Sequence, residues 1–504
     1  MNHHIHAPIN SSGSPTKDNK IQPNFEASDK MLEQLRSLAD LAGKDQPTRH
    51  EELLETLLQQ IEPIDFRDVA GLGEEDKITR KHYQVITIEQ ILKLAAKSSW
   101  GLCRHNEAVY LYNGCYWSMI EEELLKSFLG KAGEKMGMDK FQARHYMEKD
   151  ALVKQFFASA YLPAPLISDG KVLVNLQNGT YEITAEGNKL RPFAAADFLI
   201  YQLPFAYNSS AKAPKFQAYM DQVLPDKALQ DILAEFLGYV FIPTGVLKLE
   251  KVLLLYGSGA NGKSVFFEIV SALLGDENIS SYSLQSLTND NGYFRAKLAN
   301  KLVNYASEIN GKLETSIFKQ LASGEPVEAR LPYGQPFMLT RYAKLVFNCN
   351  ELPKEVEHTN AFYRRFLIIP FEATIPEAEQ DKDLAKKIIE DELSGVFNWA
   401  LKGLQRLLTN KTFTHSDVVV RQLADYRKQG DSVQMFLEEQ QYVKSSSSYT
   451  LIKGLYAEYR QYCVEDGYHP VSKVNFRKRL ESAGISVNKH NVGNVAYLEI
   501  ARNK

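Results

Sequence analysis

The middle of the chain alternates short apolar runs with longer stretches in which apolar residues recur at helical spacing. A short run of consecutive apolar residues is typical of a strand that is buried on both faces of a sheet. Because helical or loop segments separate these runs, residues 246–410 are expected to form a mostly parallel α/β domain. The strands predicted in it lie at residues 252–256, 302–305, 345–347 and 366–369.

Residues 86–245 combine strand and helix patterns, which indicates an α+β domain or a helical adaptor. Asn178-Gly179 is a turn signal within this region. The elements expected here are strands at 108–112 and 171–175 and helices at 120–130 and 216–239.

Smaller parts are expected at the two ends of the chain. Residues 1–30 contain few large apolar side chains, as in a disordered arm, and leucines at helical spacing predict helices within residues 31–85. Residues 411–448 are expected to form linker helices that end in a polar stretch. In residues 449–504 two helical patterns precede terminal strand patterns, which is typical of a winged-helix module.

Composition limits the classes of function. A chain of 504 residues is long enough for several domains, and its 44% hydrophobic and 24% charged residues are ordinary for a soluble protein. The net charge of -3 means that any nucleic-acid surface must be local. Four widely separated cysteines suggest neither a disulfide framework nor a zinc site, which fits a reducing cytoplasm. No apolar run is long enough for a membrane span, so no membrane partner is expected.

A phosphate-binding loop follows the first predicted strand of the α/β domain. Glycines allow the backbone N–H groups of such a loop to surround phosphates, and the following helix presents its positive end to the same anion. Lys263 is expected to neutralise phosphate charge and Ser264 to hold Mg²⁺, so ATP and Mg²⁺ are the expected ligands. The residues expected to bind nucleotide are Gly257, Ser258, Gly259, Ala260, Asn261, Gly262, Lys263, Ser264 and Val265.

Two polar residues follow the next predicted strands. Glu308 ends the second strand, where its carboxylate could orient the attacking water or hold Mg²⁺ through a water. Ser307 precedes it, at a position where many ATP-hydrolysing motor proteins with a phosphate loop have Asp. Asn350 follows the third strand and is expected to contact the γ-phosphate or the water, with Asn348 as the alternative.

Arg364 and Arg365 precede the last predicted strand. Two guanidinium groups beside a buried strand are costly unless they meet an anion. In an ATPase whose subunits form a ring, such an arginine reaches the γ-phosphate that the neighbouring subunit holds. The alternative is a salt bridge within the chain, to Glu372 or Glu357.

In this order, the motifs resemble those of the superfamily 3 DNA helicases, and within them the phage and plasmid primase-helicase family that includes poxvirus-type members. The resemblance extends from about residue 86 to the C-terminus. It rests on five blocks, GSGANGKSVFFEIVSALLG, KLVNYASEIN, FKQLASGEPVEAR, KLVFNCNELP and FYRRFLIIPF.

The resemblance implies an AAA+-like ATPase core that forms a hexamer and moves along single-stranded DNA, usually 3′ to 5′. It further implies that Glu308 is the second nucleotide motif, that Asn350 is the sensor and that Arg365, with Arg364, is the arginine finger. Gln177-Asn178-Gly179 and the stretch at 235–238 resemble parts of the helicase-associated domain, placed here at 86–245. The expected compartment is the cytoplasm of a bacterial host.

Such helicases place a β-hairpin between the acid and the sensor. Here residues 327–331 and 337–340 are expected to pair, with Pro332 to Gln335 as the tip. Tyr333 is expected to stack on a base, although no lysine or histidine occupies the tip as in the family pattern. The phosphate contacts expected near the hairpin are Lys319, Arg330, Arg341 and Lys344.

The C-terminal tail has a local excess of positive charge, with seven basic residues against two acidic ones from residue 471 onward. This excess favours contact with DNA phosphates, and a merely solvated helix face is the alternative. The expected DNA contacts are Lys473, Arg477, Lys478 and Arg479.

The interpretation that these observations favour is an ATP-dependent replicative helicase of a phage, prophage or plasmid-like element, acting on single-stranded and forked DNA. No acidic pair in a strand context precedes residue 86, so the chain is not expected to synthesise primers, and a separate primase or loading protein is the expected partner. One alternative is a nucleotide-switched DNA-binding assembly or defence ATPase without unwinding. A phosphate-loop kinase is disfavoured by the arginine pair and the basic tail.

Overall fold

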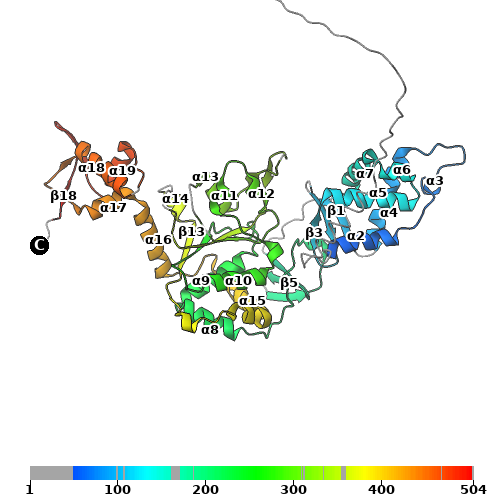
Figure 1. The fold of residues 1–504 in the computed structure, drawn as a ribbon, viewed down its shortest axis with the longest axis horizontal. Coiled ribbons are helices and arrows are strands. Elements are labelled where there is room, and N and C mark those ends of the chain that lie inside the picture. The colour runs from blue at the N-terminus through cyan, green and yellow to red at the C-terminus, as the bar shows by residue number, and fades with distance from the viewer. Residues whose placement is uncertain are drawn as a thin grey trace, which may run out of the picture.

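The computed structural model describes residues 49–97, 100–105, 108–160, 171–184, 187–307, 309, 313–332, 334–353, 359–466 and 468–501. The predictions for the arm at 1–30, for the helices before residue 49, for Glu308 and for Tyr333 lie outside these residues. The described chain forms a central α/β part with a smaller part on either side of it, as Figure 1 shows.

A five-stranded parallel sheet forms the central part, in the order β13-β7-β12-β9-β8. The four predicted strands are confirmed, and the fifth, β8, was missed because its two residues leave no periodic pattern. The strands are β7 (Val252–Tyr256), β8 (Ile279–Ser280), β9 (Val303–Ala306), β12 (Lys344–Cys349) and β13 (Phe366–Pro370).

Both faces of this sheet are buried, which explains the uninterrupted apolar runs. Along β7, Leu253 and Leu255 belong to one core cluster, and Val252 and Leu254 belong to the other. The first face is covered by α8 (Pro214–Val223), α9 (Lys227–Tyr239), α10 (Lys263–Leu274) and α15 (Leu384–Asn410), seen below the sheet in Figure 1. The second is covered by α11 (Leu284–Thr288), α12 (Tyr293–Ala296), α13 (Thr315–Ser323), α14 (Asn360–Tyr363) and the hairpin β10 (Val327–Ala329) and β11 (Phe337–Leu339).

The single helix predicted at 216–239 is instead two helices, α8 and α9. Pro225 falls between them, and proline lacks the N–H that a continuing helix needs. Asp226 then caps α9 by accepting from the backbone N–H of Ala228 at 2.8 Å. The helical periodicity continues across this break, so the pattern alone did not reveal it.

The main core of the N-terminal part contains residues from Leu54 to Ala160. The boundary expected at residue 86 lies inside α4, because Ile86 shares this core with Leu57 from α2. The elements are α2 (Arg49–Gln60), α3 (Phe66–Val69), α4 (Arg80–Lys97), β1 (Gly101–His105), β2 (Ala108–Tyr112), β3 (Trp117–Ile120), α5 (Glu122–Met136), α6 (Lys140–Arg144) and α7 (Tyr146–Ser159).

A second antiparallel sheet, β4 (Val172–Leu176), β5 (Gly179–Thr184) and β6 (Gly187–Arg191), packs on the central part rather than on the N-terminal core. The region expected as one domain at 86–245 is therefore divided between two cores. Leu176 pairs with Gly179, which confirms the predicted turn at Asn178. Single helical turns occur at η1 (Ala195–Asp197), η2 (Asp276–Asn278) and η3 (Glu377–Glu379).

Helix α16 (Asp417–Gly430) leads from the central part to the C-terminal module (Figure 1). The module begins earlier than residue 449, because Val433 and Phe436 belong to its core and β14 pairs with β18. Its elements are α17 (Ser432–Glu439), β14 (Tyr442–Lys444), β15 (Thr450–Leu451), α18 (Ile452–Glu465), α19 (Lys473–Ser482), β16 (Val487–His490), β17 (Gly493–Ala496) and β18 (Leu498–Ile500). Among the described helices, none has the length and apolar character needed to cross a bilayer.

Candidate nucleotide site

The phosphate-loop residues connect β7 to α10 in a backbone conformation that requires glycine. Gly262, at the start of α10, has a φ of 88°, and a Cβ there would lie 2.7 Å from Cγ1 of Val223. The buried Tyr219 hydroxyl donates to the Gly262 carbonyl at 2.8 Å. Helix α8 therefore packs directly against the loop and fixes its shape.

Lys263 is held inside the loop. Its Nζ donates to the Gly257 carbonyl at 2.6 Å and to Oδ1 of Asn261 at 3.0 Å. Burial lowers the pKa of this ammonium group. Asn261 is itself fixed, because its Nδ2 donates to the carbonyl of Phe371 at 3.0 Å. The loop thus places a buried cation among groups that an anion can displace, while Ser264 is exposed in the first turn of α10.

Strand register brings the expected sensor beside the loop. Cys349 pairs with Tyr256, and the N–H of Gly257 donates to the Cys349 carbonyl at 3.1 Å. Asn350 follows and is exposed, whereas Asn348 is buried and accepts from the Tyr305 hydroxyl at 3.0 Å. The Asn348 side chain is thus engaged within the sheet, and the role of Asn350 as the sensor stays a prediction.

The end of β9 lies at the same edge of the sheet. Ala306 pairs with Phe347 of β12, so Ser307 emerges beside the sensor strand. A cavity of about 330 Å³ lies there, lined by Phe267, Ser281, Ser283, Tyr305, Ala306 and Ser307. Glu308, the next residue, lies outside the described part of the chain. Within the described residues, no group of three or more His, Cys, Asp or Glu side chains gathers as a metal site.

The arginine pair lies at the other edge of the same sheet. Strands β13 and β7 are parallel, with Phe366 opposite Val252 and Pro370 opposite Tyr256. Arg364 and Arg365 therefore lie where these strands begin, whereas the phosphate loop lies where β7 ends. Five strand residues separate the two edges by roughly 16 Å.

The two arginines have different surroundings. Arg365 is 7% exposed and donates to Ser323 Oγ at 3.0 and 3.3 Å and to the Ala361 carbonyl. Arg364 is exposed, and its Nη2 lies 2.8 Å from Oε2 of Glu250. Arg365, expected to reach a neighbouring subunit, is therefore engaged within its own chain. Among the described residues the acid that pairs with the arginines is Glu250 rather than the expected Glu372, and the other expected acid, Glu357, lies outside the described part of the chain.

The predicted hairpin is present, with Val327 opposite Leu339 and Ala329 opposite Phe337. Arg330 donates from Nη2 to the Tyr293 hydroxyl at 3.0 Å and lies over that ring. Arg341 is exposed and Lys319 is half-buried. Apolar side chains are also exposed around the hairpin, namely Leu331, Phe337 and Met338.

Lys344 does not belong to this surface. Its ammonium lies 4.2 Å from the centre of the Tyr239 ring, and burial lowers its pKa to about 8. Lys344 is the first residue of β12, and its half-buried side chain lies over this ring. Its contact with DNA phosphate stays a prediction.

Replacing Lys344 by Met should stabilise the protein at neutral pH. The pKa of Lys344 is lower in the folded state than its ordinary 10.5, so the unfolded state binds more protons between about pH 8 and 10.5. The charged Lys344 therefore lowers the free energy of unfolding by its full amount, up to about 3 kcal/mol, below pH 8. This destabilisation becomes smaller as the pH rises toward 10.5. Urea unfolding at pH 7 and pH 9.5 should show the advantage of the Met variant shrinking; an advantage independent of pH would contradict the assignment.

The basic residues of α19 are only partly available. Lys473, Arg477 and Lys478 are exposed, although Arg477 pairs with Glu481 at 3.0 Å along the helix. Arg479 donates to Asp431 at 3.0 Å and so attaches α19 to the start of α17. Of the four expected DNA contacts, Arg479 thus has a structural partner.

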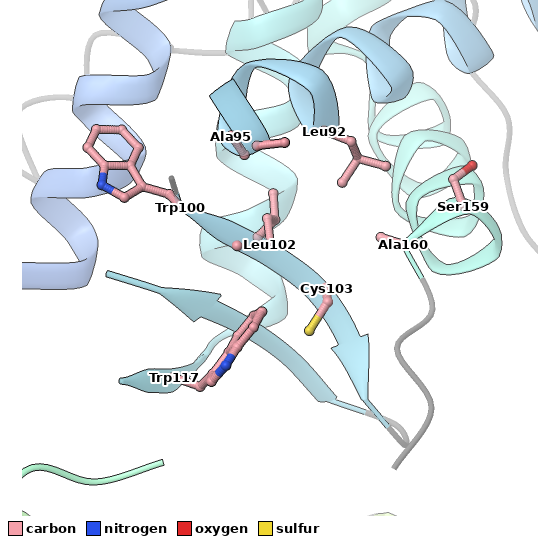
Figure 2. Close-up of a pocket in the computed structure, with 10 residues that line it drawn as sticks. Leu92, Ala95, Trp100, Leu102, Cys103, Trp117, Ser159 and Ala160 are labelled. Atoms are coloured by element: carbon pink, nitrogen blue, oxygen red, sulfur yellow. The ribbon is translucent and has the colours of Figure 1, made fainter. Parts of the chain in front are cut away.

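A second cavity, of about 310 Å³, lies in the N-terminal part and is unrelated to this site. Figure 2 shows its mainly apolar lining, which includes Trp100, Leu102 and Trp117. Burial raises the pKa of the Cys103 thiol there to about 12, so the thiol stays protonated and unreactive.

Two residues of the site carried no sequence signal. Tyr219 contacts the loop from more than forty positions earlier in the chain, within a helix whose apolar spacing is that of ordinary packing. Glu250 lies two residues before β7 but contacts Arg364, 114 positions later. Packing of α8 brings Tyr219 to the loop, and pairing of β7 with β13 brings Glu250 beside the arginines.

The fold and the site together define a phosphate-loop protein with a parallel five-stranded core and small antiparallel sheets attached to it. Residues 77–225 match the protein family described as D5 N terminal like, and residues 255–365 match the family of unknown function DUF5906. The chain is therefore similar to D5-like proteins in the first of these ranges and to DUF5906 proteins in the second, and the resemblance inferred from its motifs is confirmed.

A protein of Acanthamoeba polyphaga mimivirus named "Putative helicase L207/L206" is 22% identical over 295 residues. The match covers 56% of this chain and about 30% of that protein's length. Two A-form apo structures of the NrS-1 C-terminal region each cover 82% of this chain and 99% of their own, at 12% and 11% identity and TM-scores of 0.43 and 0.44.

Proposed function

We propose that this chain is an ATP-driven DNA helicase of superfamily 3, with an AAA+-like core, that works as a ring on single-stranded DNA. The observation that supports this best is the placement of the phosphate loop and the exposed Arg364 at opposite edges of one sheet. Within one chain the length of the strands separates Arg364 from the loop by roughly 16 Å, which is longer than an arginine side chain. On this proposal a second copy supplies the arginine, and a closed arrangement of such copies gives a ring, a hexamer by resemblance.

On this proposal the residues of the loop bind ATP between subunits. Lys263 leaves the Gly257 carbonyl and pairs with phosphate oxygens, and backbone N–H groups of the loop surround the same anion. The glycine-requiring loop and its buried ammonium fit a triphosphate with Mg²⁺, which would be held by Ser264 and Glu308 and would neutralise developing phosphate charge. Glu308 orients the attacking water, and Asn350 contacts the γ-phosphate.

The DNA contacts belong to the proposal as well. The hairpin presents exposed apolar side chains on which bases can stack, with Arg330 and Arg341 nearby for phosphates. The winged-helix-like tail presents Lys473, Arg477 and Lys478. A replicative role in a phage, prophage or plasmid-like element, in the cytoplasm of a bacterial host and with a separate primase or loader, is part of the same proposal.

Strand separation on a forked DNA duplex with ATP and Mg²⁺ tests the function. The protein should release the displaced strand, and Lys263→Ala should not, because the substitution removes the cation that phosphate needs. Separate forks with a 3′ or a 5′ single-stranded tail give the direction. ATP hydrolysis without strand separation on either fork would instead favour the nucleotide-switched assembly or defence ATPase.

A further inference from the structure

One carboxylate lies among the cations at the arginine edge of the central sheet. Oε2 of Glu250 lies 2.8 Å from Arg364 Nη2 and 3.6 Å from Arg365 Nη2, and Oε1 lies 3.5 Å from Lys248 Nζ. Lys251 completes the group by donating from its Nζ to the Arg364 carbonyl. Glu250 is therefore the acid that both arginines share.

The backbone of Glu250 is unusual. Its φ is 54°, in the left-handed region that residues with a Cβ seldom occupy. The N–H of the preceding Leu249 donates to the buried Tyr239 hydroxyl at 3.2 Å, which helps to hold this conformation. A disfavoured conformation that aims one carboxylate at an exposed arginine suggests a role for that contact.

Arg364 can bind a further anion while it is paired with Glu250. Only its Nη2 is engaged by Glu250, and among the described residues its Nη1 and Nε have no partner. The Arg364 side chain is 56% exposed, whereas that of Arg365 is 9% exposed and bonded to Ser323. A guanidinium has five N–H donors, so one edge can bind a carboxylate while another binds phosphate.

We infer that Glu250 is a positioning residue, which orients Arg364 for the γ-phosphate bound by the neighbouring subunit. This inference rests on the proposed function, because it requires ATP to be hydrolysed between subunits. Arg365 then acts from within its own chain, by fixing the end of α14 to Ser323 of α13. The arrangement differs from the expectation that Arg365 is the group that crosses the interface.

The test is the steady-state rate of ATP hydrolysis by the full chain with single-stranded DNA. Glu250→Ala should lower kcat by about tenfold to hundredfold, as for a misplaced catalytic group, and leave the KM for ATP unchanged. Glu250→Gln keeps an oxygen that accepts from Arg364 and should recover most of the rate. Glu325→Ala, the matched control, removes a nearby carboxylate that pairs with Lys248 and should change neither constant.

A double-mutant cycle separates positioning from a merely structural effect. In an Arg364→Ala background, Glu250→Ala should cause no further loss, because its target is already absent. Equal losses in both backgrounds, a rise in KM, or an unimpaired Arg364→Ala variant would overturn the inference. If Glu250→Ala does not fold, Glu250→Asp takes its place, because the shorter side chain withdraws the carboxylate from Arg364. A Glu250→Asp rate equal to that of the wild type would then overturn the inference. Hydrolysis that survives Lys263→Ala would instead refute the proposed function itself.

Discussion

A mixture of Lys263→Ala and Arg364→Ala subunits is expected to hydrolyse ATP, although neither variant alone does so. Each variant removes one half of a site that two chains share, since the phosphate loop and Arg364 lie at opposite edges of the sheet. Loss of an arginine finger lowers the rate by about 10³ to 10⁵. In mixed rings, about a quarter of the interfaces combine an intact loop with an intact arginine when the two variants are equal in amount.

The control for this experiment uses two residues from the same half of the site. A mixture of Lys263→Ala and Glu308→Gln subunits should stay inactive, because no interface regains both groups. Hydrolysis is measured after the subunits have been mixed under conditions that allow exchange. Failure of the first mixture to recover, with exchange shown by a labelled subunit, would mean that Arg364 acts within its own chain.

Replacing Glu308 by Gln is expected to leave ATP binding intact and to lower hydrolysis by about 10² to 10⁴, the usual contribution of a positioned base. Glu308 follows the last residue of β9 by two positions in the sequence, and β9 ends at the sheet edge where Lys263 and Asn350 lie. Glutamine keeps the size of the side chain but cannot accept a proton from water. Binding of ATP, measured by calorimetry, should therefore match the wild type while turnover falls.

Lys263→Ala is the matched control, since it should lose binding and turnover together. Unchanged hydrolysis in Glu308→Gln would remove this residue from the mechanism. Loss of binding together with turnover would assign Glu308 to the metal rather than to the water.

The sequence by itself predicted the elements whose signal is local. Strand β7 coincides with its predicted range of 252–256, because a strand buried on both faces needs apolar residues at every position. The phosphate loop follows from glycine spacing, and the hairpin from two strand patterns around a turn-prone tip. Each of these depends on residues that are close together in the chain.

Tertiary structure alone decided the questions that depend on distant contacts. Asn348 is engaged by a hydrogen bond from Tyr305 of another strand, whereas Asn350 is exposed. Arg364 and Arg365 differ in their surroundings. The buried guanidinium of Arg365 donates to Ser323, whereas the exposed guanidinium of Arg364 pairs with Glu250. The cores also cross the boundaries drawn at residues 86 and 449, since packing joins segments by their apolar faces rather than by their order. Local pattern fixes which elements form, whereas burial and pairing between distant elements determine which polar side chains remain available for chemistry.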